Sequence, residues 1–233
     1  VFLWQSGNKY RVSAHDADMK ETEAIYGQTD SGMTIIEGHL FLNGKKPIQH
    51  RSSYGLGEVI KAALDNHTEH LVISLGGIGS FDGGAGMLQA LGATFYDDEA
   101  QIVDMRKGAY LIKYIRRIDL SGVHPQLTKV NIQLMSDFSS RLYGKKSEIM
   151  QTYESLDLSQ NEAAEIDNLI WYFSELFKNE LKIAMGPIER GGAGGGIAAV
   201  LNSLYQADVL TSHELVNQST HLENLIQQAD LII

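Results

Sequence analysis

The chain contains no cysteine and only three prolines among its 233 residues. Without a thiol it forms no disulfide, offers no thiolate to zinc and has no cysteine nucleophile. It also lacks a run of about 18 apolar residues, so the sequence predicts no membrane-spanning helix, and its first residues lack the pattern of a secretion signal. These absences lead us to expect a soluble, cytoplasmic protein.

Basic residues are in the minority. There are 19 Lys and Arg against 29 Asp and Glu, which gives a formal net charge of −10 at pH 7. This balance argues against a surface for duplex nucleic acid or for an anionic membrane. We therefore expect neither nucleic acid nor a membrane as a partner, while the oligomeric state stays open. A hydrophobic content of 43% is enough to fill the core of one large domain or two small ones.

The first third of the chain predicts β-strands. Residues 10–15 and 21–26 are rich in β-forming side chains, and turn residues at 30–32 precede the apolar segment 33–37. Short strands joined by such turns are typical of hairpins. We expect residues 1–50 to form mainly antiparallel β hairpins.

From Tyr54 the apolar period becomes helical, with Leu56, Val59, Ile60 and Ala63 on one face. A buried strand follows at 71–75. A glycine-rich turn then leads to a short apolar helix and to a further strand at 93–96. The order strand, helix, strand predicts a parallel pair with a right-handed crossover.

Three further patterns complete the expected fold. Residues 130–134 alternate between apolar and polar side chains, as in a strand that ends at Asp137. Ser159 and Glu162 have capping-box spacing at the start of the longest expected helix. A buried-type strand is expected at 229–233. Together these patterns predict one α/β domain over 1–233, in which a layered, mixed sheet with an antiparallel N-terminal part has helices on its faces.

The turn from Gly76 to Gly86 is the most informative segment, because it is rich in glycine and holds a single carboxylate, Asp82. Clustered glycines indicate positive φ or a close approach by another group. One interpretation is that the turn binds phosphate or carboxylate at a helix N-terminus. The other is tight packing between strand and helix, with Asp82 capping the helix through the N–H group of Gly84 or Ala85.

A second glycine-rich turn, Gly191–Gly196, also leads into an apolar helix and offers a second place for an anion. Neither turn matches the P-loop or the dinucleotide-binding pattern. Asp137 follows an apolar strand, so it either faces a ligand or forms an Asx turn with Ser139. The histidines show no spacing typical of a metal site, and we assign no metal to protein ligands.

Several motifs resemble, in order along the chain, those of the bacterial glycerate kinase family, type I. They are Tyr54–Glu58, Gly76–Gly92, Ile118–Gly122, Gly192–Leu201 and Ala229–Ile232. The resemblance implies an enzyme with two α/β domains and its active site between them, of which this chain is similar to the inserted domain. It also implies a fragment of a larger protein, because family segments rich in glycine and acidic residues are absent here.

Three segments depart from the family pattern. Phe81 stands where the family usually has an amide, Ser136–Leu142 lacks the Asn-Pro of the corresponding family segment, and Lys46–Ile48 replaces a further Asn-Pro-Leu. These departures keep open an alternative, in which the protein is a catalytically degenerate homologue that binds a small carboxylate or has a regulatory role.

By this resemblance, the full-length protein would transfer the γ-phosphoryl group of ATP to D-glycerate with Mg²⁺ as cofactor, and the isolated chain would be inactive. Asp82 would orient or deprotonate a glycerate hydroxyl, and Asp82→Asn would lower kcat while folding stays nearly intact. Residues of the two turns and the strand end would hold substrate or phosphate. They are Gly76, Gly77, Ser80, Gly83, Gly84, Asp137, Gly192, Gly194, Gly195 and Gly196.

Overall fold

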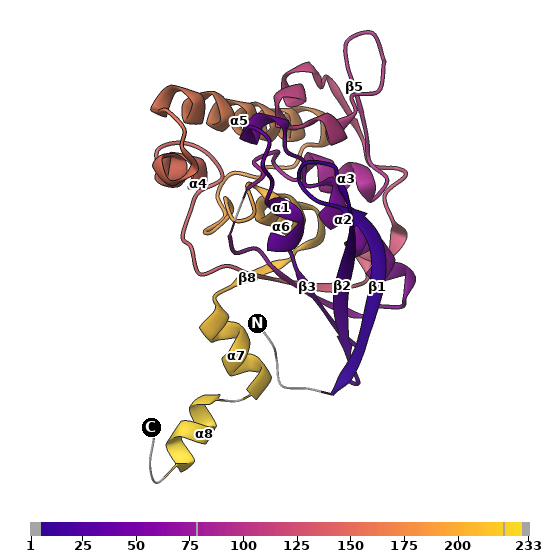
Figure 1. Cartoon of the computed structure of the whole chain (residues 1–233), viewed down its shortest axis with the longest axis vertical. Helices are drawn as coiled ribbons and strands as arrows, with labels where there is room; N and C mark the ends of the chain where they lie inside the picture. Colours follow the sequence, from indigo (N-terminus) through magenta and orange to yellow (C-terminus); the bar gives the residue numbers. More distant parts are fainter. Residues whose placement is uncertain (1–5, 78, 221, 230–233) are drawn as a thin grey trace.

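A computed structural model describes residues 6–77, 79–220 and 222–229 (Figure 1). It contains a six-stranded sheet in the order β1-β2-β3-β4-β7-β8 and a two-stranded sheet of β5 and β6. The predicted α/β class, with helices on the faces of a mixed sheet, is confirmed. The strand expected at 229–233 lies outside the described residues, except for Ala229.

The N-terminal strands are antiparallel, as predicted. β1 (Gly7–His15) pairs with β2 (Glu21–Thr29) over its whole length, and β2 pairs with β3 (Met33–Glu37). Gly32 turns the chain between β2 and β3 with a φ of 83°, a conformation that glycine adopts without strain. In Figure 1 the long β1–β2 hairpin forms one side of the molecule.

The rest of the large sheet is parallel. β3 pairs with β4 (His70–Ser74), β4 with β7 (Asn131–Met135), and β7 with β8 (Asp208–Leu210). The strand β3 therefore joins the antiparallel hairpins to the parallel part. The strands predicted from the segments 71–75 and 130–134 are therefore β4 and β7, the two inner strands of this parallel part.

Alternate residues of β4 face two different cores. Leu71 and Ile73 belong to the main core, which also holds the buried faces of α2 (Tyr54–Asp65) and α6 (Ile197–Tyr205). Val72 points to the other face, where it packs with Leu215 of α7 (Ser212–Thr220). Helices thus cover both faces, and α7 and α8 (Leu222–Gln228) extend beyond the body of the molecule in Figure 1.

The prediction of a parallel strand pair with a crossover after the first glycine turn is wrong. The helix α3 (Ala85–Ala90) has only six residues, and β5 (Thr94–Tyr96) pairs antiparallel with β6 (Arg117–Asp119) in the small sheet. A helix of six residues is about 9 Å long, too short to return the chain beside β4 at full strand length. The parallel neighbour of β4 comes instead from β3, through α1 (His39–Leu42) and α2.

The longest helix is α5 (Gln160–Leu181), and its predicted capping box is present. Ser159 N–H donates to the Glu162 carboxylate at 2.8 Å, and Glu162 N–H donates to Ser159 Oγ at 3.3 Å. Phe173 and Phe177 are fully buried, with ring centroids 4.9 Å apart. Burial of each ring stabilises the fold by roughly 1.5–3 kcal/mol, so α5 is fixed on the core chiefly by these rings.

Short elements connect the rest of the described chain. They are the 3₁₀ helices η1 (Ile48–His50), η2 (Met105–Lys107), η3 (Ala109–Tyr114), η4 (Pro125–Thr128) and η5 (Tyr153–Leu156), and the helix α4 (Glu148–Thr152). No helix among the described residues is long and apolar enough to cross a membrane.

Candidate functional site

The four parallel strands all end at one edge of the large sheet, the place where open α/β sheets bind ligands. Backbone bonds hold the segments that leave these strands. Leu75 N–H donates to Met135 O at 2.9 Å. Ser136 N–H donates to Leu210 O, also at 2.9 Å. The loops after β4, β7 and β8 therefore lie side by side.

Three predicted site residues lie at this edge and are exposed: Gly76, Gly77 and Asp137. We call them the strand-end group. No atom lies within 4 Å of the position that a Cβ would take at Gly76. Gly77 has a φ of 72°, and its carbonyl accepts a bond from Asn43 Nδ2 at 2.6 Å. The backbone of Gly76 and Gly77 is thus accessible to a ligand.

Asp137 contacts the start of α7. Its Oδ1 accepts bonds from Ser212 N–H at 2.7 Å and from Ser212 Oγ at 2.9 Å. The carboxylate therefore caps a neighbouring helix, instead of forming the Asx turn with Ser139 that was the alternative to a ligand contact. It remains exposed at the strand ends, so a second contact on its outer side is open.

Asp82 lies deep in the domain and is fully buried. Its Oδ2 accepts bonds from Ser53 N–H at 2.8 Å, from Ser53 Oγ at 2.9 Å and from Gly86 N–H at 3.1 Å. Its Oδ1 accepts a bond from Gly84 N–H at 3.0 Å. The predicted cap through Gly84 is confirmed, and all four donors belong to the protein itself.

The N-terminal N–H groups of α3 are already occupied. Besides the bonds from Gly84 and Gly86 to the Asp82 carboxylate, Ala85 N–H donates to Asp82 O at 3.0 Å, and Met87 N–H donates to Ser53 Oγ at 2.9 Å. A helix N-terminus attracts negative charge. Here the chain supplies that charge itself, in the form of Asp82.

Burial raises the pKa of the Asp82 carboxyl, and the hydrogen bonds from Ser53, Gly86 and Gly84 act in the opposite direction. A buried carboxylate with several N–H and O–H donors is a stable arrangement, whereas one without them is strongly destabilising. Asp82 thereby joins the start of α2 to the start of α3. The catalytic role expected for it stays a prediction.

The second glycine turn packs directly against the first. Gly83 N–H donates to Gly195 O at 3.0 Å. A Cβ at Gly195 would lie 2.0 Å from Ser80 O, and one at Gly196 would lie 2.9 Å from the Cα of Gly83. We call residues 80–84 and 191–196 the glycine junction. All of its residues are buried, so glycine here permits two backbones to meet.

The second turn also uses its own N–H groups. Gly196 N–H donates to Gly192 O at 3.1 Å, and Ala198 N–H donates to Ala193 O at 3.0 Å. These bonds occupy donors at the start of α6 that an anion would need. The structure thus brings Ser80, Gly83 and Gly84 together with the turn from Gly192 to Gly196, and separates them from the strand-end group.

Glu148, at the start of α4, is a buried residue that the sequence did not point to. It is 8% exposed, and its Oε2 has no hydrogen-bond partner among the described residues. Burial raises its pKa to about 8. It follows two lysines and a serine, a polar segment that predicts an exposed side chain. Only the fold shows that this side chain is buried.

Two serine hydroxyls, one in the junction and one outside it, also lack partners in the described chain, namely Ser80 Oγ and Ser140 Oγ. Ser80 is fully buried and Ser140 is nearly so. The Ser140 hydroxyl is 2.6 Å from the position of a Cβ at Gly192. A buried donor without an acceptor costs about 1–3 kcal/mol, so these hydroxyls are available to a further polar group.

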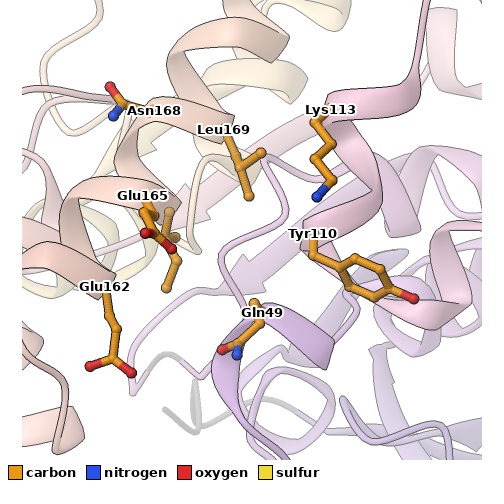
Figure 2. Close-up of a pocket in the computed structure, with 8 residues that line it drawn as sticks. Gln49, Tyr110, Lys113, Glu162, Glu165, Asn168 and Leu169 are labelled. Atoms are coloured by element: carbon orange, nitrogen blue, oxygen red, sulfur yellow. The ribbon is translucent and has the colours of Figure 1, made fainter.

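A hollow of about 340 Å³ lies elsewhere, between α5 and the segments η1 and η3 (Figure 2). Tyr110 and Lys113 form one side of it, Leu169 and Glu165 of α5 form the other, and Gln49 lies below. None of the predicted site residues lines it. It is therefore separate from the strand-end group and from the junction.

Metal-binding side chains are not clustered in the described part of the chain. Among residues 6–77, 79–220 and 222–229, no group of three or more His, Asp or Glu could hold a metal ion.

The sequence model of the glycerate kinase family matches residues 2–233. The chain belongs to this family. A glycerate kinase of Halalkalibacterium halodurans is 30% identical over 218 residues, which are 91% of this chain and 57% of that protein. A glycerate 2-kinase of Escherichia coli is 30% identical over 182 residues, which are 78% of this chain and 47% of that protein. The chain thus spans about half the length of these curated relatives.

The structure agrees with this membership. A crystal structure of a protein assigned as glycerate kinase 2 from Salmonella typhimurium LT2 matches with a TM-score of 0.88 and 26% sequence identity. The match covers 96% of this chain and 61% of the other. Nearly all of the fold described above is therefore shared with one part of a longer protein.

Proposed function

We propose that the protein to which this chain belongs transfers the γ-phosphoryl group of ATP to D-glycerate, and that the chain forms one of its two α/β domains. The family match over residues 2–233 carries this proposal. The chain covers 57% of the Halalkalibacterium halodurans protein, which leaves length for a second domain. An active site between two domains accounts for strand ends that are open in this chain alone.

In this proposal the strand-end group contacts the ligand, because Gly76, Gly77 and Asp137 are the predicted residues that are exposed. Asp82 has a positioning role, since its carboxylate would have to lose a bond from Ser53 or α3 before it could accept a glycerate hydroxyl. Phe81, the departure from the family pattern, is 1% exposed and packs in the core. The Phe81 side chain is therefore not part of the exposed strand ends.

ATP and Mg²⁺ enter the proposal through the family. The described residues offer no cluster of carboxylates for the metal, so we derive no step through it. Phosphoryl transfer depends mostly on positioning and on neutralising charge around the phosphates. The isolated chain, with one wall of such a site, should therefore show no turnover.

The test is ADP release by the full-length protein, followed in a coupled assay with D-glycerate and MgATP. Release that depends on D-glycerate supports the proposal. If no ADP is released while calorimetry still detects the binding of D-glycerate, the protein is instead the homologue that binds a small carboxylate. The 233-residue chain alone serves as the control, and turnover by it would contradict the two-domain arrangement.

A further inference from the structure

The hollow between α5 and the segments η1 and η3 is lined by opposite charges that do not neutralise each other (Figure 2). Lys113 lies on one side of it and Glu165 on the other. Neither side chain forms an ion pair with another residue that the structure describes. Both charges are therefore open to a ligand that enters the hollow.

The two chain segments that form these sides differ in charge beyond Lys113 and Glu165. The segment 105–118, which runs from η2 into β6, has no acidic residue and contains the basic residues Arg106, Lys107, Lys113, Arg116 and Arg117. The segment 160–169 of α5 has no basic residue and contains the acidic residues Glu162, Glu165 and Asp167. A ligand with one negative and one positive end is complementary to this arrangement.

Apolar surface separates the two charges. Ile166 is buried, and Leu169 and the ring of Tyr110 also line the hollow. In the view of Figure 2, Leu169 lies between Glu165 and Lys113. The volume of about 340 Å³ is near the lower end of the range for ligand pockets, which is about 300–1,000 Å³. The hollow therefore favours a small ligand with an apolar middle.

Two contacts decide which charged groups can bind such a ligand. Lys113 Nζ lies 5.1 Å from the centroid of the Tyr114 ring, a cation–π contact that leaves ammonium donors for a carboxylate. Glu162 also lines the hollow, but its Oε2 accepts bonds from Ser159 N–H at 2.8 Å and from Ser159 Oγ at 2.7 Å. Because Glu162 serves the capping box, Glu165 is the carboxylate that can accept bonds from a ligand ammonium.

We propose that this hollow binds a small zwitterion whose ammonium and carboxylate lie at opposite ends of an apolar chain, that is, an ω-amino acid. Lys113 binds the carboxylate of the ligand, Glu165 binds its ammonium, and Tyr110, Ile166 and Leu169 contact the apolar chain. The inference goes beyond the proposed function and does not depend on it, because none of the predicted site residues lines the hollow.

The test is a titration of the full-length protein with 6-aminohexanoate, without ATP or D-glycerate, followed by NMR of the Ile and Leu methyl groups. The methyl signals of Ile166 and Leu169 should shift and give one Kd. Hexanoate and hexylamine, which each keep a single charge, should bind at least about threefold more weakly. Unshifted signals at these two residues overturn the inference, and so does an affinity for either single-charge analogue that equals the affinity for 6-aminohexanoate.

Two variants then remove one charge each. Lys113→Met and Glu165→Gln should each raise the Kd for 6-aminohexanoate by about three- to tenfold, because each loses one ion pair with the ligand. Lys113→Met should leave the binding of hexylamine unchanged, and Glu165→Gln should leave the binding of hexanoate unchanged. An unchanged Kd for 6-aminohexanoate in either variant overturns the inference.

The matched controls are Lys129→Met and Glu180→Gln, since both residues are exposed and neither lines the hollow. Their Kd for 6-aminohexanoate should equal that of the wild type, and a rise as large as in Lys113→Met or Glu165→Gln overturns the inference. Transfer to D-glycerate is measured separately on the same proteins. Binding of 6-aminohexanoate without this transfer supports the inference and contradicts only the proposed function.

Discussion

The strand-end group and the glycine junction are both built from glycine, yet for opposite reasons. At Gly76 there is open space around the backbone, whereas at Gly195 a Cβ would lie 2.0 Å from Ser80 O. The first kind of glycine leaves a surface accessible to a ligand. The second allows two chain segments to contact each other where no side chain fits. Glycine content alone therefore does not distinguish a binding loop from a packing contact.

The same comparison applies to the two aspartates. Asp82 is buried with donors from two helix starts, whereas Asp137 is exposed and Ser212 is its single partner among the described residues. A helix start that binds an internal carboxylate has no N–H group left for an external one. The predicted anion site at α3 is thus occupied by the chain, and the open positions lie at the strand ends.

The largest expected effect separates the two kinds of glycine. Gly195→Ala forces a Cβ against Ser80 O at a φ of 62°, and we expect a loss of about 3–5 kcal/mol in the free energy of unfolding. Gly76→Ala, the matched control, should change it by less than about 1 kcal/mol, because nothing crowds that position. Urea denaturation measures both. Equal losses would contradict the distinction.

Asp82→Asn comes next in size. The amide nitrogen of the asparagine would be a hydrogen-bond donor where the Asp82 carboxylate accepts bonds from four donors. We therefore expect a loss of about 2–4 kcal/mol in the free energy of unfolding. This revises the expectation from the sequence that folding stays nearly intact. Ser53→Ala should cost about 1–2 kcal/mol, since it removes one partner of Asp82 and the acceptor of Met87 N–H. Thermal unfolding that is unchanged in Asp82→Asn would argue against the buried network.

The stability of the fold should also depend on pH, through Glu148. The pKa of Glu148 is raised from 4.5 to about 8 in the folded protein, so its contribution to stability is full below about pH 4.5 and is lost as pH rises through 8. We expect the unfolding free energy of the wild type to fall relative to Glu148→Gln by up to about 1.4 kcal/mol per pH unit in this window. Denaturation at several pH values checks this. A constant difference between the two proteins would be inconsistent with it.

The smallest effect on stability belongs to the strand-end group. Asp137→Asn removes a charged acceptor from Ser212, and we expect a loss below about 1 kcal/mol because the group is exposed. If Asp137 contacts the ligand, KM for D-glycerate or ATP should rise by a larger factor in the full-length protein. Glu180→Gln, at an exposed position of α5, is the control. Unchanged KM in Asp137→Asn would remove it from the proposed site.

Much of the fold was predictable from the sequence, because each signal was local. The face of α2, the alternation in β7 and the capping box of Ser159 and Glu162 all depend on residues a few positions apart. The predicted parallel crossover from β4 to β5 was wrong, because strand pairing depends on residues that are far apart in the sequence. The sequence order strand, helix, strand did not show that α3 ends after six residues and that β5 pairs with β6.

The candidate site divides in the same way. The sequence by itself determined that the turns are glycine-rich, that Asp82 can cap a helix and that the chain has motifs of the glycerate kinase family. Only the tertiary structure decided that the two turns meet, that Asp82 occupies the helix start, and that Glu148 is buried. The contact between Gly83 and Gly195, for example, joins residues that are more than a hundred positions apart in the sequence. A glycine or an acid takes its role from what the fold places beside it.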